Sequence, residues 1–201
     1  MDVEDRLEEF VLEHWSKGTV PLGWGTAFLY NELLDREAED EPVRVWLVTA
    51  GRLMKGTGTW SRRGGVAVAP VGLLHEFAQH QGAQVTDGVA ATAEHVRAVG
   101  EERRAYALGY VHEAGDRRPL AIATSNVARD PDGVVRWRGA LPDGFVGSPV
   151  FIFEHQKGRE FIVLCLGLIA SAERNPDVAT FDVIRSVIGK ATQPPKRRWF
   201  R

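Results

Sequence analysis

Short apolar runs separated by turn-forming residues dominate the chain between Trp24 and Ser171. Runs rich in Val, Ala, Leu and Ile are typical of β-strands, and Gly, Pro and Asp between them are typical of turns, as in Asp130-Pro131-Asp132-Gly133. We expect strands at Trp24–Tyr30, Arg44–Ala50, Arg62–Pro70, Ala105–His112, Leu120–Val127, Gly133–Trp137, Ser148–Glu154 and Glu160–Ser171. Many short strands in series predict an all-β barrel or sandwich.

The two ends of this β region carry helical patterns. Apolar residues recur at helical spacing in residues 2–16 and again in Pro176–Lys190. We expect the first helix to pack on the body of the domain; the alternative is a docking helix for a partner. Residues 89–104 fit either a helix or a strand followed by a turn. The expected organisation is a helix at 1–17, a β domain with its C-terminal helix at 18–190, and a basic tail at 191–201.

Composition limits where the chain works and what it binds. Cys165 is the single cysteine, so no intrachain disulfide can form, and we expect it to be buried. The N-terminus lacks the basic start and apolar run of a signal peptide, and no apolar stretch reaches about 18 residues. We therefore expect a cytoplasmic protein with no membrane span. Residues 1–41 hold 12 acidic and 3 basic residues, which disfavours a nucleic-acid partner.

Two sequence patterns come close to known cofactor or metal motifs without matching them. The His75–His80 segment (HEFAQH) resembles the zinc motif HExxH, but five positions separate its histidines, which would lie on different faces of a helix. The Gly51–Thr57 segment (GRLMKGT) resembles a phosphate loop with its lysine misplaced. We expect neither a metal nor a cofactor.

Four segments, in order, resemble landmarks of the trypsin-like serine protease family, in particular its bacterial members. They are Leu22–Leu29 (LGWGTAFL), Trp46–Leu53 (WLVTAGRL), Gly65–Pro70 (GVAVAP) and Gly144–Phe151 (GFVGSPVF). The last is similar to the family's GxSGGPVF loop around the nucleophile, and Gly167–Ser171 (GLIAS) is similar to the strand that lines its substrate cleft. The resemblance implies a mainly β protein with two β-barrels, and the helical patterns add a helix at each end. Only 12 residues separate Arg52 from Gly65, which implies that the first barrel is reduced.

The resemblance places residues without suitable chemistry at all three catalytic positions. Arg52 stands at the histidine position, Gly65 at the aspartate position and Val146 at the nucleophile position. Arginine stays protonated and is a poor base, glycine has no side chain, and valine has no heteroatom. Phe145 replaces the aspartate that animal members use to bind a freed N-terminus. The chain is therefore expected to be a pseudoprotease and not an enzyme.

The expected function is peptide or protein binding, with a regulatory or scaffolding role. The resemblance implies a cleft rimmed by Arg52 whose peptide-binding residues are Gly144, Phe145, Val146, Gly147, Ala170, Ser171 and Ala172, where an extended peptide could pair by strand addition. One alternative is an active serine protease that uses Ser148 or another non-standard nucleophile. Another is an interaction domain whose cleft is filled. The partner and the oligomeric state stay open.

Overall fold

The structure is a computed structural model, and it describes residues 3–33, 43–54, 59–71, 84–100, 102–112, 118–156 and 159–193. The His75–His80 motif and nearly all of the basic tail lie outside these residues.

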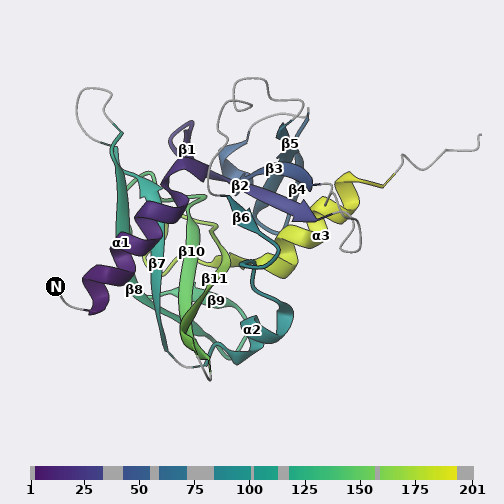
Figure 1. The fold of residues 1–201 in the computed structure, drawn as a ribbon. Helices are drawn as coiled ribbons and strands as arrows, with labels where there is room; N and C mark the ends of the chain where they lie inside the picture. Colours follow the sequence, from purple (N-terminus) through teal and green to yellow (C-terminus); the bar gives the residue numbers. More distant parts are fainter. Residues whose placement is uncertain are drawn as a thin grey trace, which may run out of the picture.

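The first half of the chain forms a helix and a six-stranded sheet (Figure 1). Its elements are α1 (Val3–Trp15), the 3-10 helix η1 (Ser16–Gly18), β1 (Thr19–Leu22), β2 (Gly25–Leu33), β3 (Val43–Ala50), the 3-10 helix η2 (Gly51–Leu53), β4 (Ser61–Arg63), β5 (Val66–Pro70) and β6 (Val85–Thr86). The strands pair antiparallel in the order β1-β2-β3-β5-β4, and β6 adds in parallel to β2.

The second half forms another six-stranded sheet in the order β12-β11-β10-β7-β8-β9. Its elements are α2 (Ala93–Ala98), β7 (Arg103–Tyr110), β8 (Leu120–Arg129), β9 (Val135–Trp137), β10 (Pro149–Gln156), β11 (Arg159–Ile169), β12 (Val178–Thr180) and α3 (Phe181–Ala191). The two edge strands approach each other through an isolated bridge between Arg136 and Asp177, so this sheet is a nearly closed barrel. The mainly β architecture agrees with the prediction at this level.

One apolar core joins the two sheets. Phe28 and Val48 from the first sheet lie in the same buried cluster as Tyr106, Leu108 and Phe151 from the second. Cys165 is fully buried in this cluster, as expected, and burial raises the pKa of its thiol well above the usual range. The described part of the chain therefore packs as one unit.

Helix α1 packs on the body of the protein, which agrees with the first of the two interpretations of its apolar face. The Phe10 ring meets Phe153 edge-on at 6.1 Å and Phe161 at 6.0 Å, and Thr124 Oγ1 donates to Glu8 Oε1 at 2.5 Å. Figure 1 shows the helix lying across the strands of the second sheet.

Helix α3 is attached to the first sheet by rings and by one arginine. Phe181 meets Tyr30 edge-on at 5.0 Å. Arg185 donates to Ala91 O at 2.7 Å and lies 3.5 Å from Asp87 Oδ1, which also accepts the Tyr30 hydroxyl at 2.5 Å. Burial, with the Asp87 hydrogen bond second, raises the pKa of Tyr30 far above its usual range, so the phenol stays a donor.

Three element predictions differ from the structure. Arg62–Pro70 is a hairpin and not one strand, because Gly64 (φ +57°) and Gly65 (φ +80°) form a turn between β4 and β5. The predicted helix over Pro176–Lys190 begins only at Phe181, since Val178–Thr180 pairs with β11 as β12. The open segment 89–104 contains the short helix α2 and the start of β7.

Candidate functional site

The positions of Arg52 and Gly65 lie next to each other at the edge of the first sheet. Arg52 is exposed in η2, directly after β3, and Gly65 is in the β4–β5 turn. The Gly51 amide donates to the Gly65 carbonyl at 2.7 Å, which joins the two segments. A Cβ built on Gly65 would lie 3.4 Å from the Ala170 Cβ, so this corner touches the end of β11 in the second sheet.

The Gly144–Gly147 turn meets the first sheet near the same corner. Val146 is only 3% exposed, and its carbonyl accepts the Thr26 amide at 2.8 Å. A Cβ built on Gly25 would lie 2.6 Å from both Leu53 Cδ1 and Val146 O. Val146 therefore lies against the strand and the 3-10 helix that carry Gly25 and Arg52.

Thr26 fixes this turn through its side chain as well as its backbone. Its Oγ1 donates to Gly144 O at 2.8 Å and accepts the Tyr110 amide at 3.0 Å. Gly147 has φ +89°, and a Cβ there would lie 2.0 Å from Thr26 O, so only glycine fits. Fully buried Thr26 therefore holds the turn between the two sheets.

At the Gly144–Gly147 turn, the predicted cleft is only a small depression. A cavity of about 20 Å³ is bordered by Gly144–Val146, Ser171–Ala172 and Trp24. This volume is close to that of one probe sphere, so it has room for about one water molecule and none for an amino-acid side chain. Gly147 and Ala170 do not line it: Gly147 is buried beneath the turn, and Ala170 lines, together with Gly65 and Ser171, a separate groove of about 690 Å³.

Trp24 stands beside this depression and had no assigned role in the sequence prediction. It is 42% exposed and is the one large exposed hydrophobic side chain among the described residues. The Arg52 guanidinium carbon lies 5.5 Å from the centre of its ring, in a cation–π arrangement. Arg118 donates to the preceding Gly23 carbonyl, which helps to hold the turn that presents the tryptophan.

Ser148 points away from the depression. The residue is fully buried, and a Cβ built on Gly109 of β7 would lie only 2.2 Å from its Oγ. Its Oγ has no hydrogen-bond partner among the described residues. Phe145, at the position where the resemblance expects aspartate, is 1% exposed in the core of the second sheet. Substrate in solution therefore cannot reach the Ser148 hydroxyl without movement of the turn.

One histidine approaches the turn, although it is distant from it in the sequence. His112 Nε2 lies 2.7 Å from Trp24 O, and its Cδ2 would lie 2.9 Å from a Cβ on Gly144. His14 bonds Phe10 O and His95 caps α2. No hydrogen bond joins a described imidazole to a described serine hydroxyl. His155 and the His75–His80 motif lie outside the described side chains.

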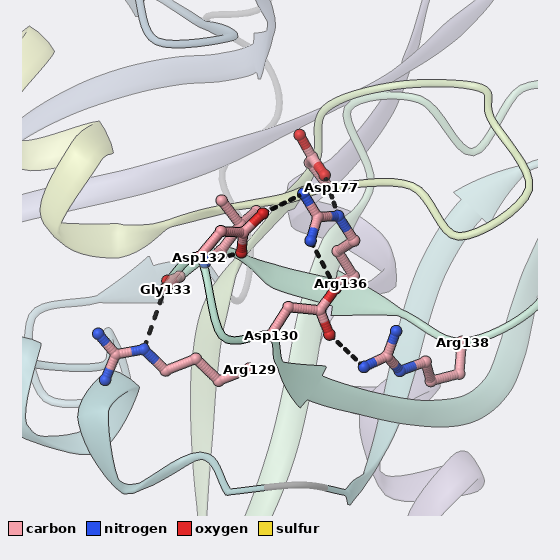
Figure 2. Close-up of polar contacts among 8 residues, drawn as sticks. Arg129, Asp130, Asp132, Gly133, Arg136, Arg138 and Asp177 are labelled. Carbon is pink, nitrogen blue, oxygen red and sulfur yellow. Dashed lines mark hydrogen bonds and ion pairs between the residues drawn. The ribbon is translucent and has the colours of Figure 1, made fainter.

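The Arg136 guanidinium lies among the carboxylates of Asp130, Asp132 and Asp177, where a bound cation would otherwise lie (Figure 2). Arg136 donates to Asp132 Oδ2 and to Asp177 Oδ1, both at 2.9 Å, and also to Asp130, which Arg138 contacts as well. Hydrogen bonds from Arg136 hold the pKa of Asp130 and of Asp132 below the usual value. Within the described ranges, no group of three or more His, Cys, Asp or Glu side chains is arranged to hold a metal ion.

Comparisons with known proteins add no relative. No family model matches the chain, and no curated protein matches its sequence. Across the residues that the structure describes, no helix has both the length and the apolar character needed to cross a bilayer.

Proposed function

We propose that the chain is a catalytically inactive relative of the trypsin-like serine proteases that acts as a protein-binding module. The observation that carries the proposal is Val146, a buried side chain without a heteroatom at the turn that corresponds to the nucleophile loop. The contacts among the Arg52, Gly65 and Val146 segments support the correspondence, because residues far apart in sequence converge where the two sheets meet.

The chemistry of this corner supports a non-catalytic role. Arg52 cannot act as a base at neutral pH, and neither Gly65 nor Val146 can accept or transfer a proton. The alternative nucleophile, Ser148, is fully buried, and no base in the described part of the chain is in hydrogen-bond contact with it. A serine hydroxyl needs such a base to become nucleophilic, so the active-protease alternative lacks support.

The depression at the Gly144–Gly147 turn is too small to be a binding pocket, so the expected contact there is with the surface. A 20 Å³ depression cannot bind a substrate side chain, but exposed Trp24 with Arg52 stacked on it fits the character of a protein interface. Tryptophan and arginine are the residues most enriched at interface hot spots. The proposed partner is therefore a protein that covers Trp24, Arg52 and the rim at Ser171–Ala172.

The proposal includes a reducing, cytoplasmic location and excludes nucleic acid as the partner. The single cysteine is buried and cannot form an intrachain disulfide. The strongly acidic first 41 residues would repel phosphates.

Site-specific photo-crosslinking tests the binding surface. A benzophenone amino acid replaces Trp24 in the full chain, in the cells that naturally make the protein, and a matched chain carries it at exposed Glu9 on α1. We expect a discrete adduct from position 24 that is absent from position 9 and is lost when Arg52→Glu is added. Identical adducts from both positions, or none from position 24, would contradict the proposed surface.

A further inference from the structure

Strand β8 has an outer edge that β9 covers at one end only. β9 pairs with the last three residues of β8, and the Arg138 amide then donates to Asn126 O at 2.8 Å. The next amide, that of Gly139, donates to Asn175 Oδ1 at 2.7 Å, so the chain leaves β8 at this point. The edge from Leu120 to Thr124 therefore has no neighbouring strand among the described residues. Figure 1 shows β8 on the outer side of the second sheet.

This part of the edge carries a row of unpaired backbone groups. Pro119 O accepts an amide from just past the end of β7 at 3.0 Å, whereas Asn126 O bonds on the opposite side of the strand. Hydrogen-bonding direction alternates along an antiparallel strand. The amides and carbonyls of Leu120, Ile122 and Thr124 therefore point away from β7. No hydrogen bond within the described part of the chain uses any of these groups.

The sequence of the edge does not block the addition of a strand. Residues 120–126 (LAIATSN) contain no charge, proline or glycine, and all of them are partly exposed. Their ladder to β7 runs without a register shift, so no bulge twists the edge away. Natural edge strands are usually protected by lysine, proline, a bulge or a covering element. An edge without such protection is typical of a strand that pairs with another chain.

The free groups are complementary to those of a second copy. A two-fold axis through Ile122 places this residue opposite itself and Leu120 opposite Thr124 of the partner copy. All three residues bond outward, and each hydrogen-bonded antiparallel pair exchanges two bonds, so every free amide and carbonyl gains a partner.

The side chains are compatible with the same pairing. Leu120 and Ile122 pack against the core that joins the two sheets, and Ala121 and Ala123 pack against the barrel core on the other face. Across the axis, apolar side chains or threonine meet on one face and alanines on the other. No like charges face each other in this pairing, and the edge carries no charge that would select a foreign segment.

We propose that the free edge of β8 is an interface with a second copy of this chain. Antiparallel pairing of the two edges joins two six-stranded sheets into one continuous sheet across a two-fold axis. Trp24 and Arg52 take no part in this edge, so the inference stands or falls separately from the proposed surface around them.

Paired charge substitutions in the full chain test the interface. The axis places Ala121 opposite Ala123 of the partner copy, so one variant carries A121K and A123K, and a second carries A121E and A123E. Each variant alone sets like charges against each other, whereas an equimolar mixture sets lysine against glutamate. The matched control carries lysine at exposed Ala93 and Ala98 of α2. Analytical ultracentrifugation measures the mass of each sample, and circular dichroism with urea unfolding establishes that each variant is folded.

We expect the wild type and the α2 control to be mostly dimeric at about 100 μM, a concentration that populates an interface with a micromolar Kd. Each charged variant alone should be monomeric, and the mixture should return to dimers. Three outcomes overturn the inference: a monomeric wild type at this concentration, charged variants that dimerise as the wild type does, or a mixture of folded variants that stays monomeric.

Hydrogen exchange followed by NMR tests the same edge without a substitution. The Ile122 and Thr124 amides are unpaired in a single copy, so their exchange should slow as the protein concentration rises. The Ala123 amide, which faces β7, is the internal control and should exchange at a constant rate. Exchange at Ile122 and Thr124 that does not depend on concentration would overturn the inference.

Discussion

Replacing Thr26 by valine removes one hydroxyl from the junction of the two sheets while keeping the shape of the side chain. The Thr26 Oγ1 serves two backbone groups at once, the Gly144 carbonyl at 2.8 Å and the Tyr110 amide at 3.0 Å. Thr26 and Gly144 are buried and Tyr110 is half-buried, so water cannot fully replace the hydroxyl. A buried group left without its partner costs about 1–3 kcal/mol. Thr26→Val should therefore lower the free energy of unfolding by about 2–4 kcal/mol.

Urea unfolding followed by tryptophan fluorescence measures this loss. Thr192→Val is the matched control, because Thr192 is exposed and its hydroxyl bonds only Gly189 O at the end of α3. The control should change the unfolding free energy by less than about 0.5 kcal/mol. Equal effects of the two substitutions would refute the conclusion that Thr26 fixes the Gly144–Gly147 turn.

Three further changes probe the junction of the two sheets, the ion pairs of Arg136 and the C-terminal helix. Gly147→Ala should lower the free energy of unfolding, measured by thermal unfolding, by at least about 3 kcal/mol. Gly139→Ala should lower it by about 1–2 kcal/mol, because Gly139 is also at positive φ but has no neighbours within 4 Å. The pKa of Asp130 is lowered in the fold, so its ionised form stabilises the protein above about pH 4, and this stabilisation is lost as pH falls through the lower folded pKa. Arg136→Leu should therefore reduce the drop in the urea midpoint between pH 7 and pH 3. Parallel curves of urea midpoint against pH for the wild type and the variant would contradict this. Arg185→Met should lower the unfolding free energy by about 1–3 kcal/mol in urea titrations, and an unchanged midpoint would show that its contacts to the 87–91 segment are not stabilising.

The alternation of apolar runs and turns predicts the longer strands, because each has one face in a core, but it does not predict the short strands β1 and β6. The misplaced boundaries have local causes. Gly64 and Gly65 form a hairpin turn inside an apolar run whose composition alone predicts one continuous strand. The apolar spacing after Pro176 continues across a short strand into α3, so periodicity alone could not separate Val178–Thr180 from the helix.

The contacts that define the site could only come from the fold. Thr26 and Gly144 are separated by 118 positions, and Arg136 and Asp177 by 41, and no spacing rule links such pairs. His112 reaches the turn because β7 ends beside it, which the sequence does not indicate. That Arg52, Gly65 and Val146 have side chains unsuited to act as a general base or nucleophile follows from the sequence, since it depends on residue types and not on geometry.

The absence of chemistry at the Gly144–Gly147 turn is tested most directly with a serine-reactive fluorophosphonate. The native chain is incubated with the probe beside a heat-denatured sample and the Ser148→Ala variant, and intact mass spectrometry records any adduct. We expect no adduct on any of the three, because the turn carries Val146 and the Ser148 hydroxyl is buried. A stoichiometric adduct on the native chain that is absent from the heated sample and from Ser148→Ala would show a working nucleophile and contradict the non-catalytic role.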